Sequence, residues 1–265
     1  MKYLVAKAEI RAAKESGKPY GFLHLSNAHH KTVGFMEADS SAKLPTVGLV
    51  YEVTGYPTYR DGRDGFRVDH LALSTDSWEG YVPHGSPTPF LARAEKLISL
   101  ISDKPLAALC RAVVGYRKFQ LYPAAQIHHH WWLGGLLAHS VDVAQRAWDF
   151  TGDELAIAAG LLHDCGKVLE FYLSKGQVMY APDLPKGGHC ALGEVVVREL
   201  CRQLRIELNP VVLEKLVGVM ETHHGREHSE LGCPRTELEY AVHSADGASA
   251  KGPSGKHPTA AEASL

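Results

Sequence analysis

The 265-residue chain lacks the marks of several protein classes. Its five cysteines are odd in number and include no Cys-x-x-Cys pair, which argues against a disulfide scaffold or a cysteine-based zinc finger. No apolar run approaches the roughly 20 residues of a membrane-spanning helix. Residues 1–14 place charges every few positions and lack the apolar core of a signal peptide. We therefore expect a reduced, cytoplasmic protein without a membrane partner.

An excess of charge of one sign is also absent. Lys and Arg total 28 and Asp and Glu total 30, so the formal net charge is −2. This balance excludes a polybasic nucleic-acid coat protein but leaves room for a local basic groove. Hydrophobic residues form 45% of the chain, enough for a sizeable core in one or two domains. The unusual abundance is of histidine, with 16 residues.

The first 80 or so residues have the pattern of β-strands. Segments 20–27, 47–55 and 66–73 alternate large apolar with small or polar side chains, and turn-forming residues separate them. This pattern predicts about five strands in a small barrel or sandwich. The stretch 81–90 holds three prolines and one glycine, which predicts a linker.

Beyond the linker the apolar period becomes that of helices, and no internal repeat is found. Helices are expected at about 90–101, 105–119, 133–150, 153–163, 189–206, 210–222 and 235–247. The fold class expected is therefore α+β with two domains, a small five-stranded β-barrel followed by an all-α bundle. The expected boundaries are barrel 1–82, linker 83–90, helical domain 91–248 and disordered tail 249–265.

Histidines and aspartates near the ends of the expected helices carry the chemistry. Imidazole and carboxylate groups bind Zn, Mn, Fe and related ions. The pair His163-Asp164 closes an apolar run, where burying an unpaired carboxylate would be expensive. Adjacent residues on a helix point about 100° apart, so His163 and Asp164 can reach one metal pair only from the end of a helix. Gly166 ends or bends the helix at this point. Further members of the set come from separate helices: His139, His189, His223, His224 and Asp246.

Each part of this set also has an ordinary structural explanation. A single histidine on an apolar helix face is more often a core residue than a ligand, and the run His128-His129-His130 could be a surface feature. Gly134 and Gly135 could allow close approach of a substrate or simply allow helix packing. The ordered set as a whole favours a metal site.

The ordered set resembles the HD-domain metal-dependent phosphohydrolase superfamily, which carries H…HD…D in this order. Segments 123–139, 161–167 and 223–246 are most similar to the YhaM-type bacterial 3′→5′ exoribonucleases, which couple an N-terminal OB-fold to a C-terminal HD domain. The resemblance covers about residues 1–250. It implies an OB-like barrel, an HD helical bundle, and metal-dependent 3′→5′ hydrolysis of single-stranded RNA, with single-stranded DNA as a further substrate.

The resemblance also implies metal ligands. A first divalent ion would be held by His139, His163, Asp164 and Asp246. Asp164 would bridge to a second ion, held by His189 with His223 or His224. Manganese is the expected metal, while iron, zinc, cobalt and nickel stay open.

Four catalytic residues are implied in the same way: Asp164, Lys167, His129 and His130. Lys167 matches the lysine of the HD-x-GK motif and would contact phosphate. His129 and His130 match paired histidines that precede Gly-Gly, and His128 is an addition. A second aspartate of the family pattern falls near Ser249 here, which leaves the role of this position open.

The β domain is the expected site of single-strand binding, because OB-folds stack bases on aromatic rings over a positive groove. Candidate aromatic residues are Tyr20, Phe22, Phe35, Tyr56, Tyr59 and Phe66. Candidate cations are Lys18, Lys31, Arg60, Arg63 and Arg67. The aromatic residues could instead be barrel core, and segment 60–67 an ordinary solvated hairpin. Residues 1–90 contain ten basic and ten acidic residues, so binding is expected to be modest.

Other functions stay open at this point. HD domains also serve as phosphodiesterases or nucleotidases for small or cyclic nucleotides, and fold does not fix substrate. The chain could be a non-catalytic OB module that binds nucleic acid, or a relaxase-like HD domain. The choice between RNA and DNA, and the formation of a homo-oligomer, are not determined by residue types.

Overall fold

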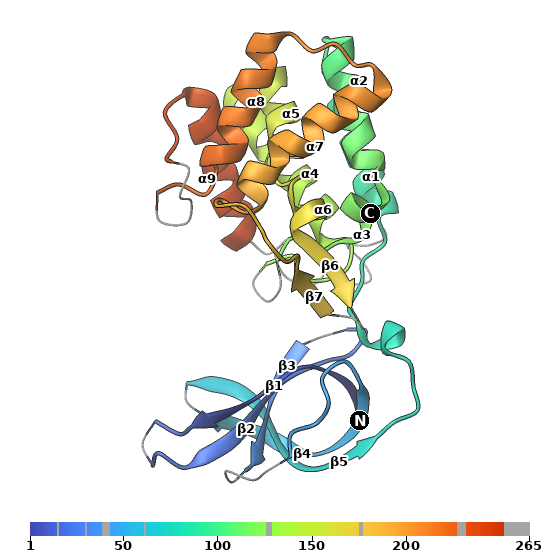
Figure 1. Cartoon of the computed structure of the whole chain (residues 1–265), viewed down its shortest axis with the longest axis vertical. Helices are drawn as coiled ribbons and strands as arrows, with labels where there is room; N and C mark the ends of the chain where they lie inside the picture. Colours follow the sequence, from blue (N-terminus) through green and yellow to red (C-terminus); the bar gives the residue numbers. More distant parts are fainter. Residues whose placement is uncertain are drawn as a thin grey trace. The chain divides into compact units, whose positions relative to one another are not determined.

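The computed structural model is α+β and describes residues 1–251 except 15, 30, 39–42, 61, 126–128, 175–176 and 227–231 (Figure 1). The chain divides into two compact units. One consists of Met1–His84 with Leu173–Met179. The other consists of Gly85–Tyr172 with the described residues from Tyr180 onward.

The first unit is built on five long strands, as the sequence predicts. They are β1 (Lys2–Ala12), β2 (Pro19–Ser26), β3 (Lys31–Glu37), β4 (Val50–Arg60) and β5 (Arg63–Leu73). They pair in the order β1-β2-β3-β5-β4, and β4 pairs with β1, so the ring of strands closes into a barrel. The β3–β5 pair is parallel and the other pairs are antiparallel. A short 3₁₀ helix, Trp78–Tyr81, follows.

Both faces of β2 are buried. Successive side chains of a strand point to opposite sides, so β2 contributes to two apolar clusters. Leu23 and Leu25 belong to the larger apolar cluster of the barrel, which also contains Tyr3, Val5, Val53 and Val68. Tyr20 and Phe22 point the other way and pack with Phe35, the cross-strand partner of Phe22 on β3.

The second unit is helical (Figure 1). Its helices are α1 (Thr88–Ile98), α2 (Lys104–Gly115), α3 (Arg117–Leu121), α4 (Gly135–Thr151), α5 (Glu154–Leu162), α6 (Lys167–Glu170), α7 (His189–Leu204), α8 (Pro210–Thr222) and α9 (Glu237–Lys251). A hairpin of β6 (Phe171–Ser174) and β7 (Gln177–Tyr180) follows α6, and its described residues within Leu173–Met179 belong to the first unit.

Local signals place most of these helix ends. The Asp103 side chain accepts a hydrogen bond from the Leu106 backbone N–H at 3.0 Å, and Pro105 lies in the first turn of α2. Asn209 caps α8 in the same way. Helix α4 ends at Gly152, whose φ of 64° is the left-handed conformation that terminates helices.

Some predicted boundaries differ from the structure. Helix α1 begins at Thr88, inside the predicted linker, with a proline in its first turn. The predicted helix 105–119 is two helices, because the chain becomes extended at Tyr116. Helix α9 continues to Lys251, past the predicted end at 247, because Ser249 is fully buried. The rest of the predicted tail, from 252, lies outside the described residues. Helix α6 and the β6–β7 hairpin were not predicted.

Helix α5 is the central element of the helical unit. Seven of its nine residues are buried, from Ala156 to Leu162, so the helix is apolar all round, as expected of a core helix. It packs closely against α4 at Gly160, where an added Cβ would lie 2.5 Å from the Ala144 Cα. Within the described residues, no helix is long and apolar enough to cross a membrane.

Candidate metal centre

The predicted histidines and aspartates of the helical unit converge from five helices. His139 lies in α4 and Asp246 in α9, while His189 is the first residue of α7. His163 and His223 follow directly after the last residues of α5 and α8. The helices pack together, so these histidines and aspartates are brought into one cluster, with some lying inside helices and others directly after helix ends. The sequence prediction that these residues meet is consistent with this arrangement.

Asp164 lies at the centre of the cluster and is 1% exposed. Its Oδ2 atom is 3.6 Å from His139 Nε2 and 3.4 Å from His163 Nε2. Its Oδ1 atom is 3.4 Å from His189 Nε2 and 3.6 Å from His223 Nε2. The two oxygens of one carboxylate therefore face two different pairs of imidazoles.

Asp246 faces the same centre from α9. Its Oδ1 atom is 3.1 Å from His139 Nε2, and its Oδ2 atom is 3.7 Å from His224 Nδ1. His224 in turn lies with its Nε2 atom 2.9 Å from that of His189. Burial alone would raise the pKa of Asp246, but the surrounding imidazoles, His139 first, lower it well below its ordinary value.

Two buried polar atoms of this cluster have no hydrogen-bond partner among the described residues: Asp164 Oδ1 and His223 Nε2. A buried acceptor left unsatisfied costs about 1–3 kcal/mol, and more when it is charged. A divalent cation between them would satisfy both, because carboxylate oxygen and imidazole nitrogen are its ordinary ligands. The ligand atoms within groups such as His139, His163 and Asp246 all lie within 4.8 Å of one another. The donor set thus fits divalent metal.

Lys167 contributes the positive charge next to Asp164. Its Nζ atom donates to Asp164 Oδ2 at 2.6 Å, and the side chain is buried. Burial alone would lower the pKa of Lys167, but the Asp164 carboxylate outweighs it and raises that pKa. Burial likewise would raise the pKa of Asp164, yet Lys167 and His163 hold it well below its ordinary value. The pair is charged in the folded protein.

The outward-facing nitrogens of the clustered histidines are held by other groups. His163 Nδ1 donates to the Gly160 carbonyl and His223 Nδ1 to the Met220 carbonyl, both at 2.8 Å. Each carbonyl lies three residues earlier in the helix that the histidine ends. These bonds fix the rings so that both Nε2 atoms point to Asp164.

Two further partners were missed or left open by the sequence. Glu170 Oε2 accepts from His189 Nδ1 at 2.8 Å, and Ser249 Oγ lies 3.1 Å from His139 Nδ1. Glu170 carries no motif that could have indicated this contact. Ser249 is distinguished in the sequence only by its position after Asp246, and its separation of 110 residues from His139 hides the contact.

The segment before α4 places two of the three consecutive histidines beside the cluster. The ring centroids of His129 and His130 lie 4.9 and 5.1 Å from that of His139. Burial lowers the pKa of His129 to about 4 and that of His130 to about 2, so both are neutral near pH 7. His128 lies outside the described residues.

Gly134 and Gly135 lie where backbone segments pack closely. Gly134 has a φ of 92°, and a Cβ at Gly135 would collide with the carbonyl oxygen of His130. The pair therefore allows the histidine segment to fold back on the start of α4.

A cavity of about 1040 Å³ opens beside the cluster. Five residues of the histidine segment and the cluster line it: His129, His189, His223, His224 and Asp246. His243 and several small residues line it as well. Tyr180, Arg226 and Lys251 complete the lining, and all three are exposed. The cavity thus joins the histidine cluster to an exposed rim that carries two cationic side chains.

The barrel aromatic residues proposed for stacking differ in exposure. Tyr20 and Phe22 are buried, at 3% and 1%. The Arg60 guanidinium lies 4.0 Å from the Tyr20 ring centroid, and Arg63 lies 6.0 Å from that of Phe22. Arg11, which was not singled out from the sequence, covers Phe22 at 3.6 Å. The rings are thus covered by guanidinium groups.

Among the other barrel candidates, Tyr56 and Tyr59 are exposed, and Phe35 is buried beside Phe22 while Phe66 is half-buried. Lys18 is exposed. Lys31 is half-buried, and this burial lowers its pKa to about 8. These residues share one barrel but not one exposed face.

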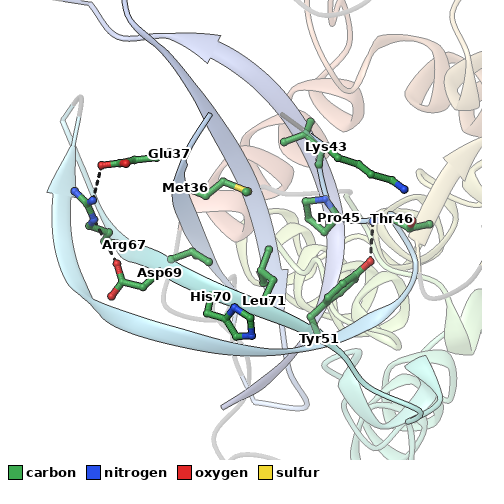
Figure 2. Close-up of a pocket in the computed structure, with 12 residues that line it drawn as sticks. Met36, Glu37, Lys43, Pro45, Thr46, Tyr51, Arg67, Asp69, His70 and Leu71 are labelled. Atoms are coloured by element: carbon green, nitrogen blue, oxygen red, sulfur yellow. Dashed lines mark hydrogen bonds and ion pairs between the residues drawn. The ribbon is translucent and has the colours of Figure 1, made fainter. Parts of the chain in front are cut away.

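Arg67 lines a separate barrel cavity of about 600 Å³. Figure 2 shows its guanidinium between Glu37 and Asp69, with contacts of 2.6 and 3.5 Å. Its charge is therefore largely compensated within the barrel, unlike that of Arg63, for which no ion pair is found among the described residues.

Comparison with known proteins identifies the family. A model of the HD domain matches residues 136–251, which contain the whole cluster from His139 to Asp246. The 3′-5′ exoribonuclease YhaM of Listeria monocytogenes serotype 4b (strain CLIP80459) is 30% identical over 262 residues, covering 89% of this chain and 79% of that protein. The chain belongs to the YhaM family.

A second relative in the YhaM family, from Oceanobacillus iheyensis, is 24% identical over 266 residues and covers 89% of this chain and 78% of its own length. Both alignments span most of this chain, so the likeness extends well outside the HD domain. No solved structure matches the chain.

Proposed function

We propose that this protein is a metal-dependent 3′→5′ exonuclease that hydrolyses phosphodiester bonds of single-stranded RNA. The observation that carries the proposal is the geometry of Asp164, whose two oxygens face two separate groups of imidazoles. One of these oxygens is buried without a hydrogen-bond partner. A carboxylate placed in this way suits a bridge between two cations.

In this proposal the cluster holds two divalent ions, with manganese favoured. One would be held by His139, His163, Asp246 and Asp164, and the other by His189, His223, His224 and the second oxygen of Asp164. When bound, such ions lower the pKa of a bound water and neutralise charge on phosphate oxygens.

The chain's own residues would place the phosphate. The Lys167 ammonium, buried against Asp164, supplies a fixed positive charge that favours the extra negative charge of the transition state. His129 lines the cavity and is neutral, so it can offer a hydrogen bond to a phosphate or sugar oxygen. His130 is 1% exposed and lies with its Nδ1 atom 3.4 Å from that of His129, so it would support His129 from behind.

The cavity favours a substrate larger than one small nucleotide. Its volume of about 1040 Å³ is at the upper end of the range of roughly 300–1,000 Å³ for small-molecule sites. Arg226 and Lys251 on its rim could bind backbone phosphates, and the exposed Tyr180 ring could stack on a base. RNA and the 3′→5′ direction are proposed because the relatives carry the name 3′-5′ exoribonuclease.

The barrel would hold the upstream strand. Its strand order β1-β2-β3-β5-β4, closed by β4 on β1, supports an OB-like assignment. Arg60, Arg63 and the exposed Tyr59 lie together around the β4–β5 turn, where a strand could contact cations and an aromatic ring. Lys31 and Arg67 are weaker candidates, because Lys31 is half-buried and Arg67 is paired with acids. Lys18 is exposed and stays a candidate.

The test is an assay with Mn²⁺, 5′-end-labelled single-stranded RNA and bis-p-nitrophenyl phosphate. A ladder of products shortened from the 3′ end is the expected result. Cleavage of the chromogenic diester without a ladder would indicate a phosphodiesterase for small substrates. Binding of RNA without turnover would indicate a non-catalytic binding protein, and either result would contradict the proposal.

The variant Asp164→Asn makes this test specific to the metal centre. We expect loss of the second Mn²⁺ per chain. We also expect turnover to fall by more than the roughly 100-fold that is typical when a residue that only hydrogen-bonds to a metal ligand is replaced. Asp149→Asn, an exposed aspartate of α4, is the matched control. Wild-type activity in the Asp164 variant would remove this cluster as the active site.

A further inference from the structure

The buried carboxylate of Glu170 has no part in the function proposed above. It ends α6 and is 6% exposed. Both of its oxygens face one residue: Oε2 accepts from His189 Nδ1 at 2.8 Å, and Oε1 accepts from the His189 backbone N–H at 3.0 Å. Among the described residues, Glu170 forms an ion pair with no lysine or arginine.

The loop before α7 is shaped around this carboxylate. Gly188 precedes His189 and has a φ of 51°, and a Cβ at Gly188 would collide with Glu170 Oε1. A glycine there lets the backbone approach the carboxylate and present both N–H groups of His189 to it. The backbone and the ring of His189 are therefore each held by one hydrogen bond to Glu170, and the Nε2 atom of the ring lies 3.4 Å from Asp164 Oδ1.

Glu170 distinguishes His189 from His139, His163 and His223. The Nδ1 atoms of His163 and His223 donate to neutral backbone carbonyls, and that of His139 lies beside the neutral hydroxyl of Ser249. Only His189, among these four, has a carboxylate behind it. A carboxylate fixes the tautomer of an imidazole and makes its other nitrogen a better metal ligand.

The two halves of the cluster differ in how closely Asp246 approaches them. Its Oδ1 atom is 3.1 Å from His139 Nε2, whereas its Oδ2 atom is 3.7 Å from His224 Nδ1 in the other half. That other half, which contains His189, His223 and His224, otherwise offers three imidazoles and the second oxygen of Asp164. Glu170 adds a further carboxylate to this half through its contact with His189.

We propose that Glu170 is a positioning residue that fixes His189 and sets the metal affinity of the His189–His223–His224 half of the cluster. The inference rests on the two-ion site of the proposed function. Replacement of Glu170 should weaken one ion specifically, because its contact reaches one half only.

The test is Mn²⁺ titration of metal-stripped full-length protein by calorimetry, with the metal content after dialysis as a second readout. In Glu170→Gln we expect one of the two binding events to weaken by about 10–100-fold, with the other within about twofold of wild type. Dialysis should then leave one ion per chain where wild type keeps two. His224→Gln, which removes a ligand of the same half, identifies the event.

Three controls separate the possible outcomes. Glu199→Gln, an exposed glutamate paired with Arg202, should leave both events unchanged. Ser249→Ala should weaken the other event, since it contacts His139. If Glu170→Gln does not fold, Glu170→Asp, which keeps the charge on a shorter side chain, should show a smaller loss confined to the same event.

Unchanged binding in the Glu170 variant that folds, or equal weakening of both events, would overturn the inference. Wild-type protein that binds no Mn²⁺ would instead contradict the proposed function itself, so the two failures are distinguishable.

Discussion

At the scale of single residues, the centre is held by a buried ion pair. Lys167 and Asp164 are both almost fully buried and 2.6 Å apart. Such a pair contributes less to stability than its distance suggests, because desolvation opposes the attraction. Removing one partner is costly, however, since it leaves an uncompensated buried charge.

Lys167→Met should therefore destabilise the metal-free protein by about 3–5 kcal/mol. Mn²⁺ should restore much of this loss, because a cation beside Asp164 replaces the missing ammonium charge. Denaturant unfolding with EDTA and with Mn²⁺ measures both effects. Lys215→Met, an exposed lysine of α8, is the control, and a metal-free Lys167 variant as stable as wild type would contradict the prediction.

The burial of His130 contributes to the acid sensitivity of the metal-free protein. Burial lowers the pKa of His130 from 6.5 to about 2, while the unfolded chain takes up this proton near pH 6.5. Because the unfolded state then binds more protons, stability falls as the pH drops below 6.5.

His130→Asn should reduce this loss of stability between pH 6.5 and 4, measured as the melting temperature of EDTA-treated protein. Asparagine tolerates the positive φ of 47° at this position. His70→Asn, at an exposed position of the barrel, should leave the pH dependence as in wild type. Parallel pH profiles for wild type and the His130 variant would show that His130 does not cause the acid sensitivity.

At the scale of elements, the α4–α5 contact sets the spacing of two ligands. Gly160 lets α5 approach α4 at Ala144, and this approach brings His139 and His163 to a Nε2–Nε2 distance of 3.3 Å. An added methyl group must push the helices apart, since it would meet backbone rather than a flexible side chain.

Gly160→Ala should lower the free energy of unfolding by about 1–3 kcal/mol and also weaken Mn²⁺ binding. The two effects are measured by denaturant unfolding and calorimetry. Gly115→Ala, at the end of α2 with open space around it, should change neither beyond a few tenths of a kcal/mol. Unchanged metal affinity in a destabilised Gly160 variant would show that helix spacing does not control the site.

At the scale of the whole molecule, the barrel and the helical unit would divide binding from chemistry. The double variant Arg60→Glu, Arg63→Glu should weaken binding of single-stranded RNA and leave cleavage of bis-p-nitrophenyl phosphate unchanged. The plot of log affinity against log salt concentration should become less steep by about 1.4, because two phosphate contacts to a single strand are lost. Arg93→Glu, on an exposed position of α1, is the control. Equal RNA affinity would contradict a role for this barrel region.

Much of the fold was predictable because its signals are local. The strand alternation before residue 80, the prolines and capping residues at helix starts, and the apolar period of the later helices all act over a few residues. Helix α6 and strands β6 and β7 were missed because each contains only four residues, which is too few to show a helical or strand period in the sequence. The end of α9 was missed because contact with His139, rather than local sequence, keeps Ser249 buried.

The sequence by itself determined which residues form the centre. Side-chain chemistry shows which groups can bind a cation, and the apolar period shows where these groups lie on the helices. Only the tertiary structure decided which oxygen of Asp164 faces which imidazoles, that Tyr20 and Phe22 are covered by arginines, and that Glu170 and Ser249 stand behind His189 and His139. These contacts join residues that are far apart in the chain or on different elements, and helix and strand packing alone fixes their distances.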